Sequence, residues 1–444
     1  MPRTLHLNAF LMGVGHHEAA WRHPRTEPQR VADVRHFVEL ARTAERGTLD
    51  SVFLADGLAV GPNVRHNIQA VFEPLTLLAA LATATDHIGL IATVSTTYNE
   101  PFNVARKFAS LDHLSGGRAG WNIVTSAQPR EAWNFSLAEH PAHADRYRRA
   151  AEFVDVAIKL WDSWEDDALV LDAAAGVFAD TDRVHEIAHT GETFAVRGPL
   201  NTPRPPQGRP LLVQAGSSAD GIAFAARYAE AVFTAQQTLA DGQAFYARLK
   251  QATTAAGRDA DLVKVLPGIA PVIGGTEAEA RALADELEAL IVPEHAIAQL
   301  SAMTGVDLSG LPLDGPLPDL PDASAVQAHQ SRYQLVVDLA RREKLTVRQL
   351  IGRLGGGRGH RVVAGTPEQI ADEIELWFTE GAADGFNVMP PLLPSGLEAF
   401  VDHVVPLLRA RGLFRHEYTG RTLREHYGLP RPASRYAERE LVTA

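Results

Sequence analysis

Short apolar segments with the composition of β-strands alternate with amphipathic helical patterns along most of this chain. About eight such strands are expected, and they lie at 5–10, 51–56, 88–95, 120–126, 210–215, 231–236, 263–273 and 385–389. Many are almost wholly apolar, as strands are in a parallel sheet that helices cover on both faces. Strands that alternate with helices run parallel and are joined by right-handed crossovers. The order of elements therefore predicts an α/β fold, a (β/α)8 TIM barrel.

The chain is longer than such a barrel needs, since it has 444 residues and roughly 250 are typical. We expect one domain over 1–444, with the surplus in an insert at 128–209, an insert at 277–361 and a C-terminal arm at 415–444. Neither insert has a strong core pattern of its own, so both are interpreted as elaborated loops over the active-site face. The second is expected to form a substrate lid, and the arm is expected to grip a second subunit in a homodimer or homotetramer.

Composition excludes several classes of protein. Without cysteine there is no disulfide framework, Cys-ligated metal or cysteine nucleophile. The 42 Lys and Arg residues against 54 Asp and Glu residues argue against nucleic-acid binding, which normally needs a basic face. Apolar runs stop far short of the roughly 20 residues of a membrane span, and the N-terminus lacks the apolar core of a signal peptide. A cytoplasmic protein without a membrane or nucleic-acid partner is expected.

In a (β/α)8 barrel, catalytic residues lie at the C-terminal ends of the strands. There is no HExxH motif, no GxSxG elbow and no defensible glycosidase acid pair in the chain. The polar residues expected at this end are Asn8, His16, Asp56, Thr93, Ser95, Asn122, Ser126, Ser217 and Ser218.

Two groups of residues suggest a ligand site. Gly216, Ser217 and Ser218 fall at a strand-to-helix turn, where backbone N–H groups and hydroxyls can bind an anion. The alternative is an ordinary N-cap serine. His143 and Tyr147 are four residues apart near the start of a helix, so they share one face and could hold one ligand. The alternative there is a solvated surface helix.

Two further motifs are interpreted as non-catalytic. The stretch 14–24 is dense in histidine, which suits zinc or iron, but no carboxylate cluster accompanies it and no metal site is expected. The glycine-rich segment 355–360 does not follow an expected strand and lacks the Lys-Ser/Thr ending of a P-loop, so a mobile lid segment is favoured.

Longer blocks carry a family resemblance. The most specific block runs from Ala105 to Arg118 and continues almost directly into Gly120 to Ser126. Through this block, the chain resembles the flavin-dependent monooxygenases of the nitrilotriacetate monooxygenase component A type, in the bacterial-luciferase-like superfamily of (β/α)8 barrels. That group includes alkane, dibenzothiophene-sulfone and EDTA monooxygenases and riboflavin lyase. The resemblance reaches about Tyr427 and is weakest at 291–357, and its shorter blocks lie at 8–10, 21–24, 53–56, 95–98, 143–147, 184–189, 214–218, 365–367 and 384–388.

The resemblance implies a cofactor and a partner. Reduced FMN would come from a separate NAD(P)H:flavin reductase, and no Rossmann fingerprint for NAD(P)H is present in this chain. Dioxygen would add to the reduced flavin, and the resulting (hydro)peroxide would oxygenate a small organic substrate. The residues implied in FMN binding are Asp56 and Thr93 near the isoalloxazine ring, and His143, Tyr147 and Ser217 or Ser218 toward the ribityl phosphate.

His16 matches a position near flavin and substrate in the long-chain alkane monooxygenase, so it is expected to orient the peroxide or shuttle a proton. For a polyacidic substrate, Arg353, Arg358 and Arg361 could form a binding cluster, or they could be solvated. The alternatives to a two-component monooxygenase are a flavin-degrading oxygenase similar to riboflavin lyase, a deazaflavin-dependent oxidoreductase and a flavin-binding protein without turnover.

Overall fold

The computed structural model describes residues 3–61, 64–66, 68, 71–318, 320 and 330–437. Within them, eight parallel strands close into a barrel as the sequence predicts, because the last barrel strand pairs back with the first. Each strand falls on one of the expected segments. In barrel order they are β1 (His6–Leu11), β2 (Ser51–Leu54), β3 (Gly89–Ser95), β4 (Ala119–Val124), β9 (Leu211–Ala215), β10 (Ala231–Thr234), β11 (Lys264–Ile273) and β13 (Gly385–Val388).

One further parallel strand, β12 (Arg361–Gly365), was not predicted. It pairs with the second half of β11, Ile269 to Ile273, outside the closed barrel. The first half of β11 pairs with β10, and its middle pairs with β13. The ten residues of β11 thus both close the barrel and carry an extra edge strand beyond it.

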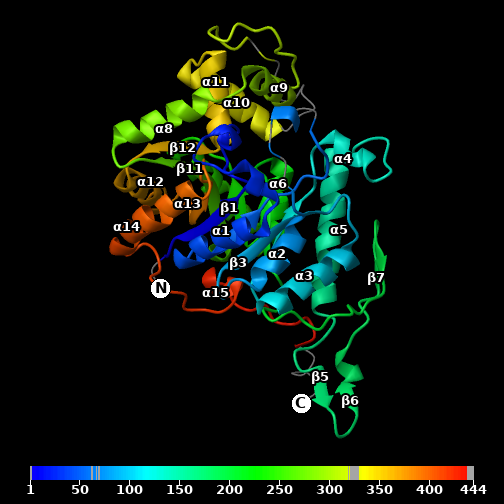
Figure 1. Cartoon of the computed structure of the whole chain (residues 1–444). Coiled ribbons are helices and arrows are strands. Elements are labelled where there is room, and N and C mark those ends of the chain that lie inside the picture. Colours follow the sequence, from blue (N-terminus) through cyan, green and yellow to red (C-terminus); the bar gives the residue numbers. More distant parts are fainter. Residues whose placement is uncertain are drawn as a thin grey trace.

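Helices surround the barrel and bury its outer face (Figure 1). Local sequence sets their ends: the Asp33 side chain accepts a hydrogen bond from the Arg35 N–H at the start of the first helix, and Gly116 ends the third with φ +66°. The surrounding helices are α1 (Val34–Arg46), α2 (Pro74–Ala82), α3 (Pro101–Ser115), α5 (His143–Trp161), α6 (Ala219–Tyr228), α7 (Leu239–Ala255), α12 (Pro367–Thr379), α13 (Ser395–Ala399) and α14 (Val405–Ala410).

The C-terminal segment seals one end of the barrel. The short helix α15 (Leu423–His426) and the residues after it place Leu423, Tyr427 and Leu429 in one cluster with the inward-facing side chains of the strands. Tyr427 also donates a hydrogen bond to Asn8 Oδ1 (2.8 Å). Asn8 therefore lies beside this plug and not at the active end, where the sequence analysis expected it. The described part of the expected arm, 415–437, contacts its own barrel instead of reaching away from it, and 438–444 lie outside the described residues.

The first insert, 128–209, contributes α4 (Pro129–Trp133) and the barrel helix α5, followed by two small antiparallel hairpins. The hairpins are β5 (Leu169–Asp172) with β6 (Val177–Ala179), and β7 (His189–Thr190) with β8 (Ala195–Val196). The hairpin of β5 and β6 extends away from the barrel at the bottom of Figure 1.

The second insert, 277–361, forms the helices α8 (Glu277–Ala289), α9 (Pro293–Thr304), α10 (Gln330–Glu343) and α11 (Val347–Gly357). Helices α9, α10 and α11 lie at the end of the molecule opposite α15 (Figure 1). Contrary to the sequence analysis, they have an apolar cluster of their own, built from side chains such as Leu300, Val336 and Leu350. In the glycine-rich segment, Gly355 to Gly357 form the last turn of α11, and the assignment of this segment to a mobile lid stays a prediction.

Candidate active site

Most of the predicted site residues lie near the C-terminal ends of neighbouring barrel strands, and His143 and Tyr147 lie at the start of α5. Below them lies a floor of three aromatic rings, Phe10, Phe53 and Phe233, whose centroids are 5.0 to 5.6 Å apart in edge-to-face contacts. All three side chains are buried inside the barrel. The floor separates this end of the barrel from the plug formed by Leu423, Tyr427 and Leu429.

His143, Tyr147 and Ser218 lie together at the start of α6. The spacing of four predicted that His143 and Tyr147 are neighbours, and the family resemblance implied that the serine turn lies beside them. The His143 and Tyr147 rings lie 4.9 Å apart, and His143 Nδ1 is 3.0 Å from an Asp220 carboxylate oxygen. Ser218 caps the helix by accepting the Gly221 N–H at 3.1 Å. Burial raises the pKa of Tyr147 although a hydrogen bond with Ser218 opposes the shift, so the phenol remains an O–H donor at neutral pH. Ser217 directly precedes this cap.

At this turn the backbone lies close to the side chains of Gln214 and Tyr147, because Gly216 has no Cβ. A Cβ there would lie 2.6 Å from Gln214 Nε2 and 3.4 Å from Tyr147 Oη. Gln214 is buried, and its Oε1 has no hydrogen-bond partner. The start of α6 and the hydroxyl groups of Tyr147 and Ser218 form a cradle suited to the polar end of a ligand that carries an anionic group, whereas Gln214 Oε1 can only accept a hydrogen bond from a ligand donor.

A second polar group lies on β3 and β4. Thr93 and Asn122 are register partners, and Asn122 Nδ2 donates to Thr93 Oγ1 at 2.8 Å. Both are buried, and Asn122 Oδ1 has no partner. Asp56 follows β2 by two residues, and burial raises the pKa of its carboxyl group while the Gly57 N–H donates to it at 2.9 Å. These residues offer both hydrogen-bond donors and acceptors to a ring placed above the aromatic floor.

His16 is buried against the Phe10 ring, with centroids 4.4 Å apart. Its Nε2 is 2.8 Å from the Phe10 carbonyl oxygen, so the proton is on Nε2 and the lone pair is on Nδ1, which has no partner. Burial and the nearby Arg358 charge lower the pKa of His16 to about 3. The neutral ring is therefore suited to accepting a hydrogen bond and not to donating a proton as an imidazolium.

The three arginines proposed from the sequence do not form a cluster. Arg353 is an exposed partner of Glu343 (3.0 Å), and Arg361 pairs with Glu373 (2.6 Å). Only Arg358 reaches the His16 segment, where its Nε donates to the His16 carbonyl oxygen at 3.2 Å.

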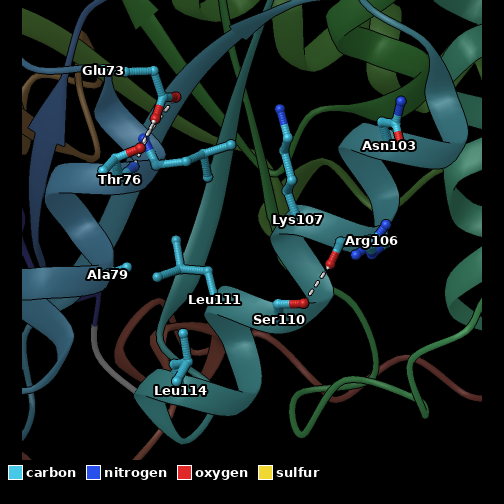
Figure 2. A pocket seen from close by; sticks show the side chains of 10 residues that line it. Glu73, Thr76, Ala79, Asn103, Arg106, Lys107, Ser110, Leu111 and Leu114 are labelled. Carbon is cyan, nitrogen blue, oxygen red and sulfur yellow. Dashed lines mark hydrogen bonds between the residues drawn. The ribbon is translucent and has the colours of Figure 1, made fainter.

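Two cavities lie outside the group of predicted site residues. One of about 400 Å³ opens on the outer wall of the barrel between α2 and α3 (Figure 2), and the other, of about 690 Å³, lies beside the start of α5. No predicted site residue lines either of them. In the histidine-rich stretch, His17 Nδ1 accepts the Ala19 N–H (3.1 Å) and His23 faces Glu286 (3.4 Å). Across the described part of the chain, no three His, Cys, Asp or Glu residues are grouped to hold a metal ion.

Sequence reasoning missed two residues on this face. Glu18 belongs to the histidine-rich stretch but was given no role, and His295 lies on α9, in the part of the chain with the weakest motifs. Both are buried, and both have a side-chain atom without a partner. The only sequence signal for His295 was that it is a polar residue inside an apolar helical pattern.

The model of the luciferase-like monooxygenase family matches residues 12–384. The chain belongs to this family. N-acetyl-S-(2-succino)cysteine monooxygenase of Bacillus subtilis (strain 168) is 52% identical over 437 residues, covering 98% of this chain and 99% of the relative. Nitrilotriacetate monooxygenase component A of Aminobacter aminovorans is 50% identical over 450 residues, with the same coverage.

A solved structure of riboflavin lyase with modified FMN and riboflavin has a TM-score of 0.86 and 32% identity, covering 98% of each chain. The resemblance predicted from the sequence is thus confirmed, as is the luciferase-like barrel. The protein is an enzyme of a flavin-dependent monooxygenase family. Among the described residues, no helix has the length and apolar character needed to cross a bilayer.

Proposed function

We propose that this enzyme is a two-component monooxygenase that receives reduced FMN from a separate NAD(P)H:flavin reductase and uses dioxygen to oxygenate a small organic substrate. The observation that carries the proposal is the convergence of His143, Tyr147 and Ser218 at the start of α6. One relative that is 50% identical is named as component A of its system, which supports a separate reductase.

The residues present fit FMN. The cradle around Gly216 and Ser218 suits the phosphate because helix N-termini favour anions. The buried Asn122 Oδ1, which lacks a partner, and the half-buried Asp56 suit the polar edge of the isoalloxazine ring. Reduced FMN would supply the electrons that activate dioxygen, and Thr93 would orient the ring through its contact with Asn122.

The protein's own contribution is to position the reactants and to exclude water. The floor of Phe10, Phe53 and Phe233 provides a dry surface beneath the site. His16 would orient a reactant by accepting a hydrogen bond at Nδ1. We propose that α9, α10 and α11 act as the substrate lid, since they lie at this end of the barrel and Arg358 joins α11 to the His16 segment.

A second candidate function treats the flavin itself as substrate. It is supported by the riboflavin lyase structure, which covers nearly the whole chain. The phosphate cradle disfavours riboflavin as the preferred ligand of this chain, because riboflavin carries no phosphate for the start of α6 to bind.

One experiment separates the two. The enzyme is supplied with FMN, NADH and a generic flavin reductase, and loss of N-acetyl-S-(2-succino)cysteine or nitrilotriacetate is followed with oxygen uptake under air and under nitrogen. Substrate loss that requires oxygen supports the monooxygenase. Loss that continues under nitrogen refutes it, and consumption of riboflavin with lumichrome as product supports the lyase.

A further inference from the structure

The segment 16–23, which follows β1, is bound to the end of α11. Arg358 caps that helix with φ +51°, and its Nε donates to the His16 carbonyl oxygen at 3.2 Å. Two residues farther along, the Glu18 N–H donates to the Gly355 carbonyl oxygen at 3.0 Å. Gly355 permits this close approach, because a Cβ on it would lie 3.2 Å from the Glu18 side chain. The last turn of α11 therefore lies directly against the residues around His16.

The same segment is also bound to α8 and to the apolar cluster of the second insert. The Arg22 guanidinium donates to the carbonyl oxygen of Leu290, which caps the end of α8. His23 Nε2 lies 3.4 Å from a carboxylate oxygen of Glu286 on that helix. Ala19 belongs to the apolar cluster of α9, α10 and α11. Polar and apolar contacts thus join the second insert to the part of the chain that carries His16.

Three hydrogen bonds fix His16 itself. Its N–H donates to the Pro390 carbonyl oxygen at 3.0 Å, and its ring Nε2 donates to the Phe10 carbonyl oxygen at 2.8 Å. These two partners belong to β1 and to the loop after β13, whereas the third, Arg358, belongs to the insert. Hydrogen bonds are directional, so the two backbone bonds constrain the main chain at His16 and the ring bond constrains its side chain. Together they hold Nδ1, which has no partner among the described residues, in one direction.

We propose that Arg358 is a positioning residue, which holds His16 in place for the reaction while α11 is seated on the segment 16–23. This role rests on the proposed monooxygenase function, in which His16 Nδ1 accepts a hydrogen bond from a reactant. Of the three partners of His16, only Arg358 would move away with the lid helices. His16 is therefore aligned only when the lid covers the site and excludes water.

Hydrogen–deuterium exchange followed by mass spectrometry measures how firmly the segment is held, and it needs no turnover. Arg358→Met removes the donor and keeps a long side chain, and methionine bears the same backbone strain at φ +51°. Peptides that cover 14–23 are expected to exchange about tenfold faster in this variant, because their amide hydrogen bonds open more often. Peptides from the barrel strands should exchange at the wild-type rate, both in the apoenzyme and in the FMN-loaded enzyme.

Two further variants serve as controls for the exchange experiment. Arg353 lies on the same helix but pairs with Glu343 at 3.0 Å on the surface, so Arg353→Met should leave the exchange of 14–23 unchanged. Arg358→Lys restores a charged donor and should recover part of the protection. Unchanged exchange of 14–23 in Arg358→Met, or an equal increase in Arg353→Met, would overturn the proposal.

Turnover tests whether Arg358 acts through His16. The assay supplies FMN, NADH, a generic flavin reductase and either N-acetyl-S-(2-succino)cysteine or nitrilotriacetate. Arg358→Met should lower kcat about tenfold and change KM and FMN affinity less than about threefold. The double variant Arg358→Met with His16→Ala should be no slower than His16→Ala alone, since residues that act as one unit are not additive.

Losses that multiply in the double variant would overturn the proposal, because Arg358 would then act independently of His16. An absence of oxygen-dependent turnover in the wild-type enzyme refutes the monooxygenase instead. The exchange comparison then still decides whether Arg358 holds the segment, so the two failures are distinct.

Discussion

Replacing Tyr147 by phenylalanine separates phosphate binding from the rest of flavin binding. The change removes one hydroxyl group and keeps the ring, which contacts His143 at 4.9 Å and Phe224 at 5.9 Å. The hydroxyl lies where a Cβ at Gly216 or Gly221 would meet it at 3.4 or 3.2 Å, beside the start of α6. It is therefore placed to donate to a phosphate at that helix end.

The magnitude follows from the charge of the acceptor. A hydrogen bond to a charged group contributes about 1.5–3 kcal/mol, which corresponds to a loss of about 10- to 100-fold in FMN affinity. Riboflavin, which lacks the phosphate, should lose less than about twofold. Anaerobic calorimetry with reduced FMN and reduced riboflavin measures both affinities.

The matched control is Tyr228→Phe. Tyr228 is the last residue of α6 and is buried, but its hydroxyl donates to the Ala151 carbonyl oxygen at 3.1 Å, away from the start of that helix. Tyr228→Phe should change neither the FMN affinity nor the riboflavin affinity. Equal losses for FMN and riboflavin in Tyr147→Phe, or no loss for either, would refute the phosphate assignment.

Three further outcomes are expected. Burial opposes ionisation of Asp50, but Arg415 and His6 outweigh it and hold its pKa at about 2, below the usual value near 4. Ionised Asp50 thus stabilises the fold by about 2 kcal/mol above pH 4, and this contribution is lost as pH falls toward 2. In urea unfolding, Asp50→Asn should have a lower free energy of unfolding than the wild type above pH 4 and a weaker pH dependence between pH 4 and 2. Arg424→Met should cost about 3–5 kcal/mol, because buried Glu230 loses its 2.6 Å partner. Sedimentation should give two or four times 48.1 kDa, and a mass of one chain would refute the expected oligomer.

The barrel was predictable because its strands are nearly continuous apolar runs that alternate with well-capped helices. Strand β12 was missed because Arg361 to Gly365 begins with a charged residue and follows a glycine-rich segment that was interpreted as part of a lid. The plug was missed for another reason: Leu423, Tyr427 and Leu429 are isolated apolar residues in a polar tail, and only tertiary contact with the strands gives them a common role.

The same limit applies to the site. The pair His143 and Tyr147 was found because a spacing of four fixes their proximity on a helix. The three candidate arginines could not be ranked from the sequence, because the acidic partners of Arg353 and Arg361 lie on other secondary-structure elements. Glu343 pairs with Arg353, and Glu373 pairs with Arg361. Both ion pairs form only when α10, α11 and α12 have packed.

The two ends of the barrel explain why polar residues in the same N-terminal segment, one on β1 and one after it, have opposite roles. Asn8 and His16 are eight positions apart, but Asn8 has its side chain satisfied by Asn387 (3.0 Å) and Tyr427 (2.8 Å), whereas His16 keeps an unpaired Nδ1. A buried polar group with all its partners stabilises the fold, and one without a partner carries a free-energy cost that a bound ligand can repay. Since the plug closes the end beside Asn8, reactants must approach from the opposite end, where His16 lies. Tyr427→Phe should therefore lower the unfolding free energy by about 1 kcal/mol and leave kcat/KM unchanged, and a loss of kcat/KM without destabilisation would contradict this division.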